Sequence, residues 1–177
     1  PSWFLRDIII LTLLTPLLCL PALAQAYTGS YGGSTLFTFS YDSGRFRMDQ
    51  DSYLGGNRSN QVWFFMLYDS DYTIDCGMFV NESTQSMSNG DTSALSLYLA
   101  GYYARYGASS QGTCTINGQG YALFSLSGVS TGGSYLAATV INGCVVTFEI
   151  YSPSAGAVDA GALSTLKTVL AGCYPAN

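Results

Sequence analysis

Residues 111–151 read QGTCTINGQGYALFSLSGVSTGGSYLAATVINGCVVTFEIY, and this stretch decides the class of fold. Glycine-containing turns, among them Asn117-Gly118 and Asn142-Gly143, divide it into short segments rich in β-branched and aromatic residues. Asn-Gly is a preferred hairpin turn because both residues tolerate a positive φ. The pattern therefore predicts four strands, at Gln111–Ile116, Tyr121–Leu126, Tyr135–Ile141 and Cys144–Tyr151.

The chain that follows predicts a helix. Asp159 is a candidate N-cap, and Gly172 is well placed to end the helix. Between them apolar residues recur at helical spacing, at Leu163, Leu166, Val169 and Leu170. The periodicity predicts an amphipathic C-terminal helix with one buried face.

Upstream, the segment Val62–Tyr68 (VWFFMLY) is apolar on both faces of a predicted strand. Val62, Phe64 and Met66 alternate with Trp63, Phe65 and Leu67. A strand of this kind must be covered twice, once by the core and once by a helix, a second layer or a ligand. Asp69-Ser70-Asp71 then predicts a turn into a partner strand at Tyr72–Val80.

A further hairpin is predicted at Thr35–Tyr41 and Arg45–Asp49, around Ser43-Gly44. In this register Tyr41 faces Phe46, and Phe39 faces Met48. Residues 27–34 are predicted to be a loose arm, and residues 50–60 and 81–93 to be loops.

The segment Ala94–Tyr106 is ambiguous, since Leu95, Leu97 and Leu99 alternate as in a strand while the composition also tolerates a helix. The surrounding glycines and tyrosines favour a strand. Together the elements predict eight or nine strands followed by one helix. The fold class is α+β and mostly antiparallel β, in a single domain over residues 27–177.

Charge excludes one class of partner. The chain has 6 Lys and Arg against 11 Asp and Glu, a net charge of −5. Nucleic-acid binding needs clustered basic side chains. Here they are scattered, at Arg45, Arg47, Arg58, Arg105 and Lys167.

The absence of histidine excludes Ser-His-Asp and Cys-His catalysis and every His-ligated metal site. A glycosidase needs two carboxylates across a cleft, but one of the two glutamates, Glu82, lies in a predicted loop and only Glu149 lies in a strand. Asp75 is an unusual acid inside a predicted strand. Asp49-Gln50-Asp51 and Asp69-Ser70-Asp71 offer oxygens to calcium without the full spacing of a calcium loop. We predict no enzyme and no cofactor, with calcium as the alternative.

An export signal is predicted at the start of the chain. The apolar segment Ile8–Ala26 follows Arg6 and ends in Ala24-Gln25-Ala26, small residues that favour cleavage before Tyr27. The competing interpretation is an uncleaved membrane anchor, against which Pro16 and Pro21 interrupt the apolar run. We predict a signal segment at residues 1–26 and a secreted, extracellular protein.

Four cysteines remain after the signal, at Cys76, Cys114, Cys144 and Cys173. An even number in an exported chain predicts two disulfides with three connectivities. Asn57-Arg58-Ser59 and Asn81-Glu82-Ser83 are sequons that predict N-glycans on Asn57 and Asn81.

Several motifs resemble the ependymin-related secreted glycoproteins. They are Phe39-Ser40-Tyr41-Asp42-Ser43, Arg45-Phe46-Arg47-Met48, Tyr72-Thr73-Ile74-Asp75 with a nearby cysteine, residues 134–139 leading to Gly143-Cys144-Val145-Val146, and the late Cys173. The resemblance implies a sheet curved as a half-barrel around a hydrophobic pocket, as in lipoprotein carriers. It also implies a Cys76–Cys173 disulfide, which leaves Cys114–Cys144 as the second pair.

The expected function is that of a secreted carrier with an apolar pocket for a lipid-like ligand. The pocket is expected to be lined by Phe39, Met48, Phe64 and Met66. The alternative is a structural subunit of an extracellular filament, coat or matrix. A carrier keeps its aromatic residues inside and is a monomer or homodimer, whereas a filament subunit exposes them and forms a homopolymer.

Overall fold

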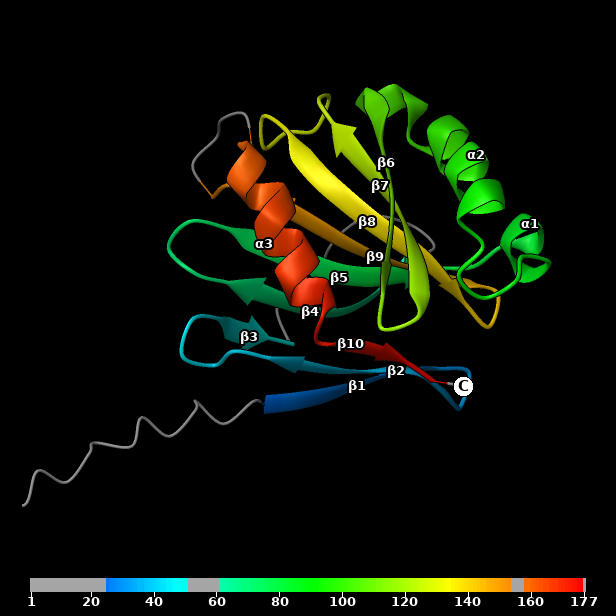
Figure 1. Ribbon diagram of the computed structural model, residues 1–177, viewed down its shortest axis with the longest axis horizontal. Helices are drawn as coiled ribbons and strands as arrows, with labels where there is room; N and C mark the ends of the chain where they lie inside the picture. The colour runs from blue at the N-terminus through cyan, green and yellow to red at the C-terminus, as the bar shows by residue number, and fades with distance from the viewer. Residues whose placement is uncertain (1–24, 51–60, 154–157, 177) are drawn as a thin grey trace, which may run out of the picture.

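The strands of the protein form two antiparallel sheets, as a computed structural model shows for residues 25–50, 61–153 and 158–176 (Figure 1). The small sheet has the order β1 (Gln25–Tyr31), β2 (Ser34–Tyr41) and β10 (Cys173–Pro175). The large sheet has the order β3 (Arg47–Asp49), β4 (Val62–Tyr68), β5 (Thr73–Phe79), β9 (Cys144–Tyr151), β8 (Ser134–Ile141), β7 (Gln119–Leu126) and β6 (Ala108–Ile116). The helices are α1 (Glu82–Gln85), α2 (Thr92–Tyr102), α3 (Ala160–Leu170) and the short 3-10 helix η1 (Ala104–Tyr106).

The α+β class, the mostly antiparallel strands and the C-terminal helix are confirmed. The strands lie in two sheets that do not close into a barrel, so the single curved sheet is corrected to two layers. Within the described ranges, no helix combines the length and the apolar character needed to cross a membrane.

The four strands predicted from residues 111–151 are confirmed as β6 to β9. Their Asn-Gly turns have the expected backbone, with φ of 52° at Asn117 and 51° at Asn142, each followed by a glycine with φ of 75°. Both turn residues therefore have positive φ, the backbone that lets a two-residue turn follow the twist of its strands.

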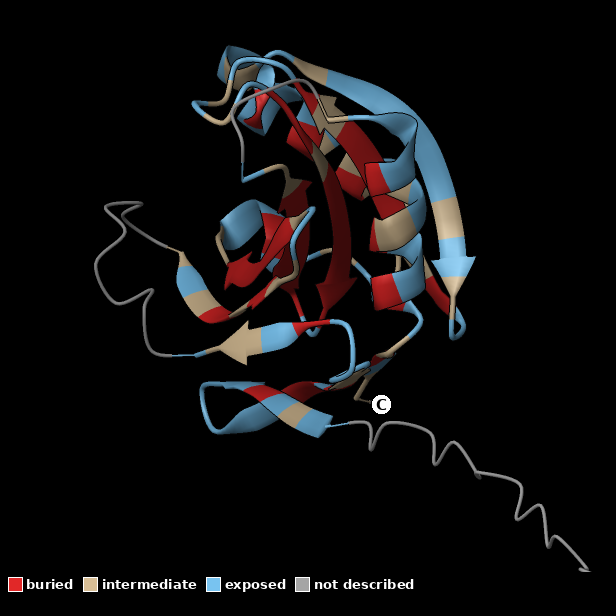
Figure 2. Ribbon diagram, turned by 90° about the vertical axis from the view of Figure 1, so that its left-hand side faces the viewer, coloured by how far each residue is buried: buried red, intermediate tan, exposed pale blue. Residues whose placement is uncertain are grey.

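One face of the large sheet packs against the small sheet and α3, and we call it the core face. Phe39 of β2 lies 4.8 Å from Phe65 of β4 and 6.0 Å from Phe148 of β9, between ring centroids. Leu166 and Leu170 of α3 join the same cluster and are fully buried. Figure 2 shows buried segments in both sheets, whereas the edge strand β6 is exposed along most of its length.

The other face of the large sheet is only partly covered, and we call it the open face. Leu95 and Leu99 of α2 pack there against Phe124 and Leu136 of β7 and β8. α2 contacts β6, β7 and β8. The part of this face formed by β5 and β9 carries the candidate site.

Strand β4 contains a register shift between Trp63 and Phe65. The ladder pairs Trp63 with Gly77 and Phe65 with Cys76, so Phe64 is an extra residue. A bulge of this kind reverses the alternation of faces. Phe64 and Phe65 both join the core cluster, and the strict alternation predicted for Val62–Tyr68 holds only on each side of the bulge.

The hairpin predicted at Thr35–Tyr41 and Arg45–Asp49 is wrong. β2 pairs with β1 and β10, whereas β3 pairs with β4, so the two predicted partners lie in different sheets. The amides of Arg45 and Phe46 both bond to the carbonyl of Asp42 in a tight turn that redirects the chain. The apolar matching of the two segments reflects burial in one core and not pairing.

Three other predictions are corrected. The arm at residues 27–34 is part of β1, β2 and their turn, and the loop at residues 81–93 contains α1. The segment Ala94–Tyr106 belongs to α2 and η1 and is not a strand. Asp91 caps α2 by accepting the amides of Ser93 and Ala94, and Leu95 and Leu99 are one helical turn apart on its buried side.

The C-terminal helix is confirmed as α3, with Asp159 as its N-cap. Gly172 follows the helix, but its role is a close approach to β2. The amide of Ser40 bonds to the Gly172 carbonyl at 2.9 Å, and a Cβ on Gly172 would lie 1.9 Å from the Ser40 carbonyl oxygen. Glycine is required there because the backbone that leads into β10 lies against the backbone of β2 in the same sheet.

Candidate functional site

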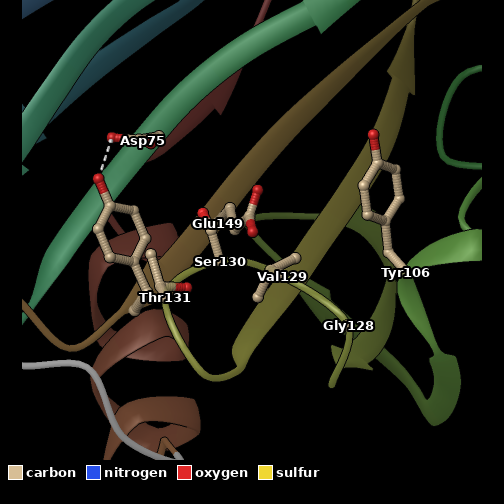
Figure 3. Close-up of a pocket in the computed structure, with 8 residues that line it drawn as sticks. Asp75, Tyr106, Gly128, Val129, Ser130, Thr131 and Glu149 are labelled. Atoms are coloured by element: carbon tan, nitrogen blue, oxygen red, sulfur yellow. Dashed lines mark hydrogen bonds between the residues drawn. The ribbon is translucent and has the colours of Figure 1, made fainter.

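A pocket of about 460 Å³ opens on the uncovered part of the open face (Figure 3). Asp75 of β5 and Glu149 and Tyr151 of β9 line it from the sheet, and Tyr106 lines it from η1. The β7–β8 loop contributes Gly128, Val129, Ser130 and Thr131. Its volume is within the usual range for small-molecule sites.

Asp75 and Glu149 are direct cross-strand partners. Their side chains are only 7% and 8% exposed, although both are acids. The Cβ atoms of such partners lie about 5 Å apart, so two carboxylates share a small space. Each reaches the pocket because the strands alternate and their other face, with Cys76 and Phe148, belongs to the core.

Hydroxyl groups orient the two carboxylates. Ser134, 3% exposed, donates a hydrogen bond of 2.7 Å from Oγ to Oε1 of Glu149. The Tyr151 hydroxyl donates to Oδ1 of Asp75 at 3.4 Å, the dashed line in Figure 3. Hydroxyl donors direct a carboxylate without adding a formal positive charge.

The loop wall of the pocket is held to η1. The amide of Gly128 donates to the Tyr106 carbonyl at 2.8 Å, and a Cβ on Gly128 would meet the Tyr106 backbone at 3.0 Å. The amide of Gly132 donates to the carbonyl of Val129 at 3.1 Å within the loop. These contacts fix Tyr106 beside the pocket.

This arrangement favours binding of a positively charged or strongly hydrogen-bonding ligand. Carboxylates form short, charge-assisted hydrogen bonds with ammonium and guanidinium groups. The Tyr151 ring adds an attractive face for a cation, whereas the Tyr106 ring already carries the Arg105 guanidinium 4.7 Å from its centroid. Among the described residues, no three His, Cys, Asp or Glu side chains lie close enough to hold a metal ion.

The four residues expected to line an apolar pocket do not converge. Phe39 and Phe64 lie in the packed core, 1% and 6% exposed, and Met48 packs against that core from β3. Met66 is the cross-strand partner of Asp75 and therefore lies on the open face. The bulge in β4 separates Met66 from Phe64.

A second cavity, of about 450 Å³, lies at the end of the β1–β2 hairpin. It is lined by Tyr31, Ser34, Leu36, Val80, Gln85, Asn142 and Cys144. None of the four expected pocket residues is among those that line either cavity.

The four cysteines within the described residues, Cys76, Cys114, Cys144 and Cys173, have free sulfurs. Cys76 and Cys173 are fully buried in the core cluster. Burial raises the pKa of the Cys173 thiol to about 11 and raises that of Cys76 well above its ordinary value. Cys114 lies on β6 and Cys144 on β9, with β7 and β8 between them, so the structure does not bring these two together.

Of the two sequons, Asn57 lies outside the described residues. Asn81 is half-buried and caps α1: its Oδ1 accepts the amide of Thr84 at 3.1 Å, and its Nδ2 donates to the Tyr98 hydroxyl. The amide nitrogen to which a glycan would be attached therefore takes part in the contact between α1 and α2.

The aspartates considered for calcium serve a turn. Asp69 Oδ1 accepts the amides of Asp71 and Tyr72 at 2.8 and 2.7 Å, and Oδ2 accepts Nε of Arg45 at 2.9 Å. Partial burial works to raise the pKa of Asp69, but the amides and the guanidinium outweigh it, so its pKa lies below the ordinary value. Asp49 lies on β3, and Asp51 lies outside the described residues.

Comparisons with known proteins show a likeness of fold. The structure is similar to the solution structure of cyanobacterial PsbP (CyanoP) from Synechocystis sp. PCC 6803, with a TM-score of 0.51 and 14% sequence identity. The alignment covers 88% of this chain and 94% of the PsbP chain. No family model matches the sequence, and no curated protein matches it.

The resemblance to the ependymin-related proteins is wrong. No family model supports it, and the structural similarity is to PsbP instead. The shared sequence motifs fall in segments such as Phe39–Ser43 and Arg45–Met48, which belong to strands of different sheets. Short alternating apolar motifs occur in many β-rich proteins, which explains the misleading match.

The carboxylate pair could not be identified from the sequence alone. Asp75 stood out as an acid in a strand, and Glu149 as the glutamate in a predicted strand, but 73 positions separate them. Their pairing follows from the register of β5 against β9, which spans distant segments. The usable signal is an acid within an otherwise apolar strand.

Proposed function

We propose that this protein is an exported, non-enzymatic binding module whose ligand occupies the carboxylate pocket on the open face. The ligand class is a small organic cation with an ammonium or guanidinium group. The observation that carries the proposal is the cross-strand pair Asp75 and Glu149, both more than nine-tenths buried at a pocket of about 460 Å³.

The charge pattern of the pocket supports this ligand class. Burial of a carboxylate is costly unless charge or hydrogen bonds compensate it, and two neighbouring carboxylates also repel each other. A cation that enters the pocket lowers both costs. A net charge of −5 adds a weaker, long-range attraction for such a ligand and disfavours nucleic acid.

The distribution of aromatic residues supports a binding module over a polymerising subunit. The largest fully buried side chains include Phe37, Phe39, Phe65, Phe124 and Phe148. A filament subunit would need such rings at its surface. The apolar ligand expected from the sequence finds less support, because the rings of Phe37, Phe39, Phe65 and Phe148 fill the space between the sheets.

Export through the segment at residues 1–26 completes the proposal, with an extracellular location for the mature domain. Strand β1 begins at Gln25, so cleavage before Tyr27 removes its first two residues. N-terminal sequencing of protein released by the producing cell tests this part by itself. A mature chain that retains Arg6 contradicts it.

Calorimetric titration of the purified protein tests the pocket. Agmatine and spermidine serve as cationic probes, and inositol serves as a neutral one. We expect the cations to bind and the isosteric variants Asp75→Asn and Glu149→Gln each to weaken binding by about tenfold or more, which corresponds to about 1.4 kcal/mol. Glu82→Gln, which removes an exposed acid on α1, is the matched control and is expected to bind as the wild type does.

Equal affinity in all three variants would show that the cations respond to net charge and not to the pocket. Binding of palmitate without binding of either cation would return the assignment to an apolar carrier. Either result overturns the proposed ligand class.

A further inference from the structure

Two of the four cysteines border the same aromatic layer from facing sheets. Cys76 of β5 lies between Phe65 of β4 and Phe148 of β9 in the ladder of the large sheet. Cys173 of β10 is the cross-strand partner of Phe39 in the small sheet. The Phe39 ring packs on both Phe65 and Phe148, at 4.8 and 6.0 Å. The row that contains Cys76 therefore lies under the strand pair that contains Cys173.

Tyr121 of β7 places a third polar group in the same region. Its side chain is fully buried, and its hydroxyl lies beside the Cys173 sulfur. Within the described residues this hydroxyl has no hydrogen-bond partner. Burial is the main cause that raises the pKa of the Cys76 thiol, and the neighbouring Cys173 adds to it.

We propose that Cys76 and Cys173 form a disulfide that joins the large sheet to the small sheet, and that the structure describes its dithiol form. The two thiols lose two protons and two electrons to a disulfide oxidant, either a thiol oxidoreductase or a small-molecule disulfide, which is reduced to two thiols. A bridge between facing sheets has a precedent in the immunoglobulin fold. The inference is independent of the ligand pocket and shares only export with the proposed function.

The other pairings fit the fold less well. Cys114 and Cys144 are separated by two strands, or about 14 Å across the sheet, beyond the reach of a disulfide. Cys114 is the cross-strand partner of Tyr121 but is only half-buried and lies toward Lys167 of α3. Cys144 lies at the second cavity.

The burial of both thiols determines when the bond forms. A thiol with a raised pKa carries little thiolate at neutral pH, and the thiolate is the reactive species. The bond is therefore expected to form during folding, before the sheets close on each other. Oxidised glutathione present during refolding of the full chain is expected to give the disulfide, whereas the same reagent added to the folded dithiol protein is expected to react slowly.

Trypsin offers a direct test because the basic residues separate the cysteines. Cleavage of the full chain gives peptide 7–45 with Cys19, peptide 59–105 with Cys76, peptide 106–167 with Cys114 and Cys144, and peptide 168–177 with Cys173. After refolding with oxidised glutathione and alkylation without reduction, we expect 59–105 linked to 168–177, with Cys19 alkylated in 7–45 and both cysteines alkylated in 106–167. A link of 168–177 to 106–167 or to 7–45, or alkylation of all five cysteines, would overturn the proposal.

A second measurement uses the melting temperature. Reductant is expected to lower the Tm of the oxidised protein by on the order of 10 °C, because the bridge closes a long loop. Reductant is expected to leave the Tm of Cys76→Ala and of Cys173→Ala unchanged. It is expected to lower the Tm of the control Cys144→Ala as much as that of the wild type. Loss of the reductant effect in Cys144→Ala alone would contradict the assignment.

The peptide map on the wild-type chain decides the question if the core variants do not fold. Because it uses oxidant in vitro, its outcome does not depend on export or on ligand binding.

Discussion

The two faces of the large sheet are made by the same strands and have opposite characters. On the core face, Phe65, Cys76 and Phe148 form a continuous buried row under the small sheet. One residue further along, Met66, Asp75 and Glu149 form a row on the open face, where a pocket replaces a covering layer. The comparison shows that one face of a strand can stabilise the fold by packing in the core while the other face lines a polar pocket.

The difference follows from coverage. α3 and the small sheet cover the core face, while α2 covers the open face over β6, β7 and β8. Where cover is complete, apolar side chains are favoured because their burial removes apolar surface from water. Where a pocket remains, acids can keep hydrogen-bond partners such as Ser134 and Tyr151.

The strongest test of this contrast compares neighbours in β9. Phe148→Ala, on the core face, is expected to lower the free energy of unfolding by about 4 kcal/mol, because it leaves a cavity among Phe37, Phe39 and Phe65. Glu149→Gln, on the open face, is expected to change it by less than about 0.5 kcal/mol, because the amide oxygen still accepts from Ser134. Urea denaturation measures both. Similar losses in the two variants would mean that the open face is a structural polar core.

The next test concerns the contact between β10 and β2 within the small sheet. Gly172→Ala is expected to destabilise the protein by about 3 kcal/mol, since its Cβ would lie 1.9 Å from the Ser40 carbonyl oxygen and push β10 from β2. Gly101→Ala in α2 is the matched control, because nothing lies within 4 Å of its Cβ. That change is expected to stabilise by about 0.5–1 kcal/mol through helix propensity. A neutral Gly172→Ala would show that β10 can shift relative to β2 without loss of stability.

A smaller effect is expected on the side of α1 and α2. Asn81→Ala removes the N-cap of α1 and the hydrogen bond to Tyr98, and it is expected to cost about 1 kcal/mol. Asn81→Asp retains the cap acceptor and loses the Nδ2 donor, so it is expected to cost less. Thermal denaturation of unglycosylated protein compares them. Equal losses would assign the effect to the Tyr98 contact.

The smallest effect is a pH dependence at the β4–β5 turn. The pKa of Asp69 in the folded chain lies below its unfolded value of about 3.9, so its contribution to stability is complete above that value and is lost as pH falls through the folded pKa. Arg45 is 40% exposed, which limits the contribution to a few tenths of a kcal/mol. Asp69→Asn is expected to flatten the acid limb of the stability curve between about pH 5 and pH 2. An unchanged acid limb would contradict this assignment.

Prediction from sequence succeeded where the signal was local. The turns at Asn117-Gly118 and Asn142-Gly143 specify their own backbone, and Asp159 with the leucines of α3 specifies a helix within 11 residues. Prediction failed for Ala94–Tyr106. The short run Leu95, Leu97 and Leu99 is compatible with the two-residue period of a strand and with the 3.6-residue period of a helix. The cap at Asp91 and the contact of α2 with β7 decided for the helix.

By itself, the sequence determined the α+β class, the hairpins from β6 to β9, the β4–β5 turn and the final helix. Only the tertiary structure decided that β2 and β3 lie in different sheets, that a bulge turns Met66 to the open face, and that Asp75 meets Glu149. Turn and helix preferences act over a few residues and are visible in the chain. Pairing between distant strands depends on the free energy of the whole packed core, because a shift of one residue would exchange the two faces of the sheet.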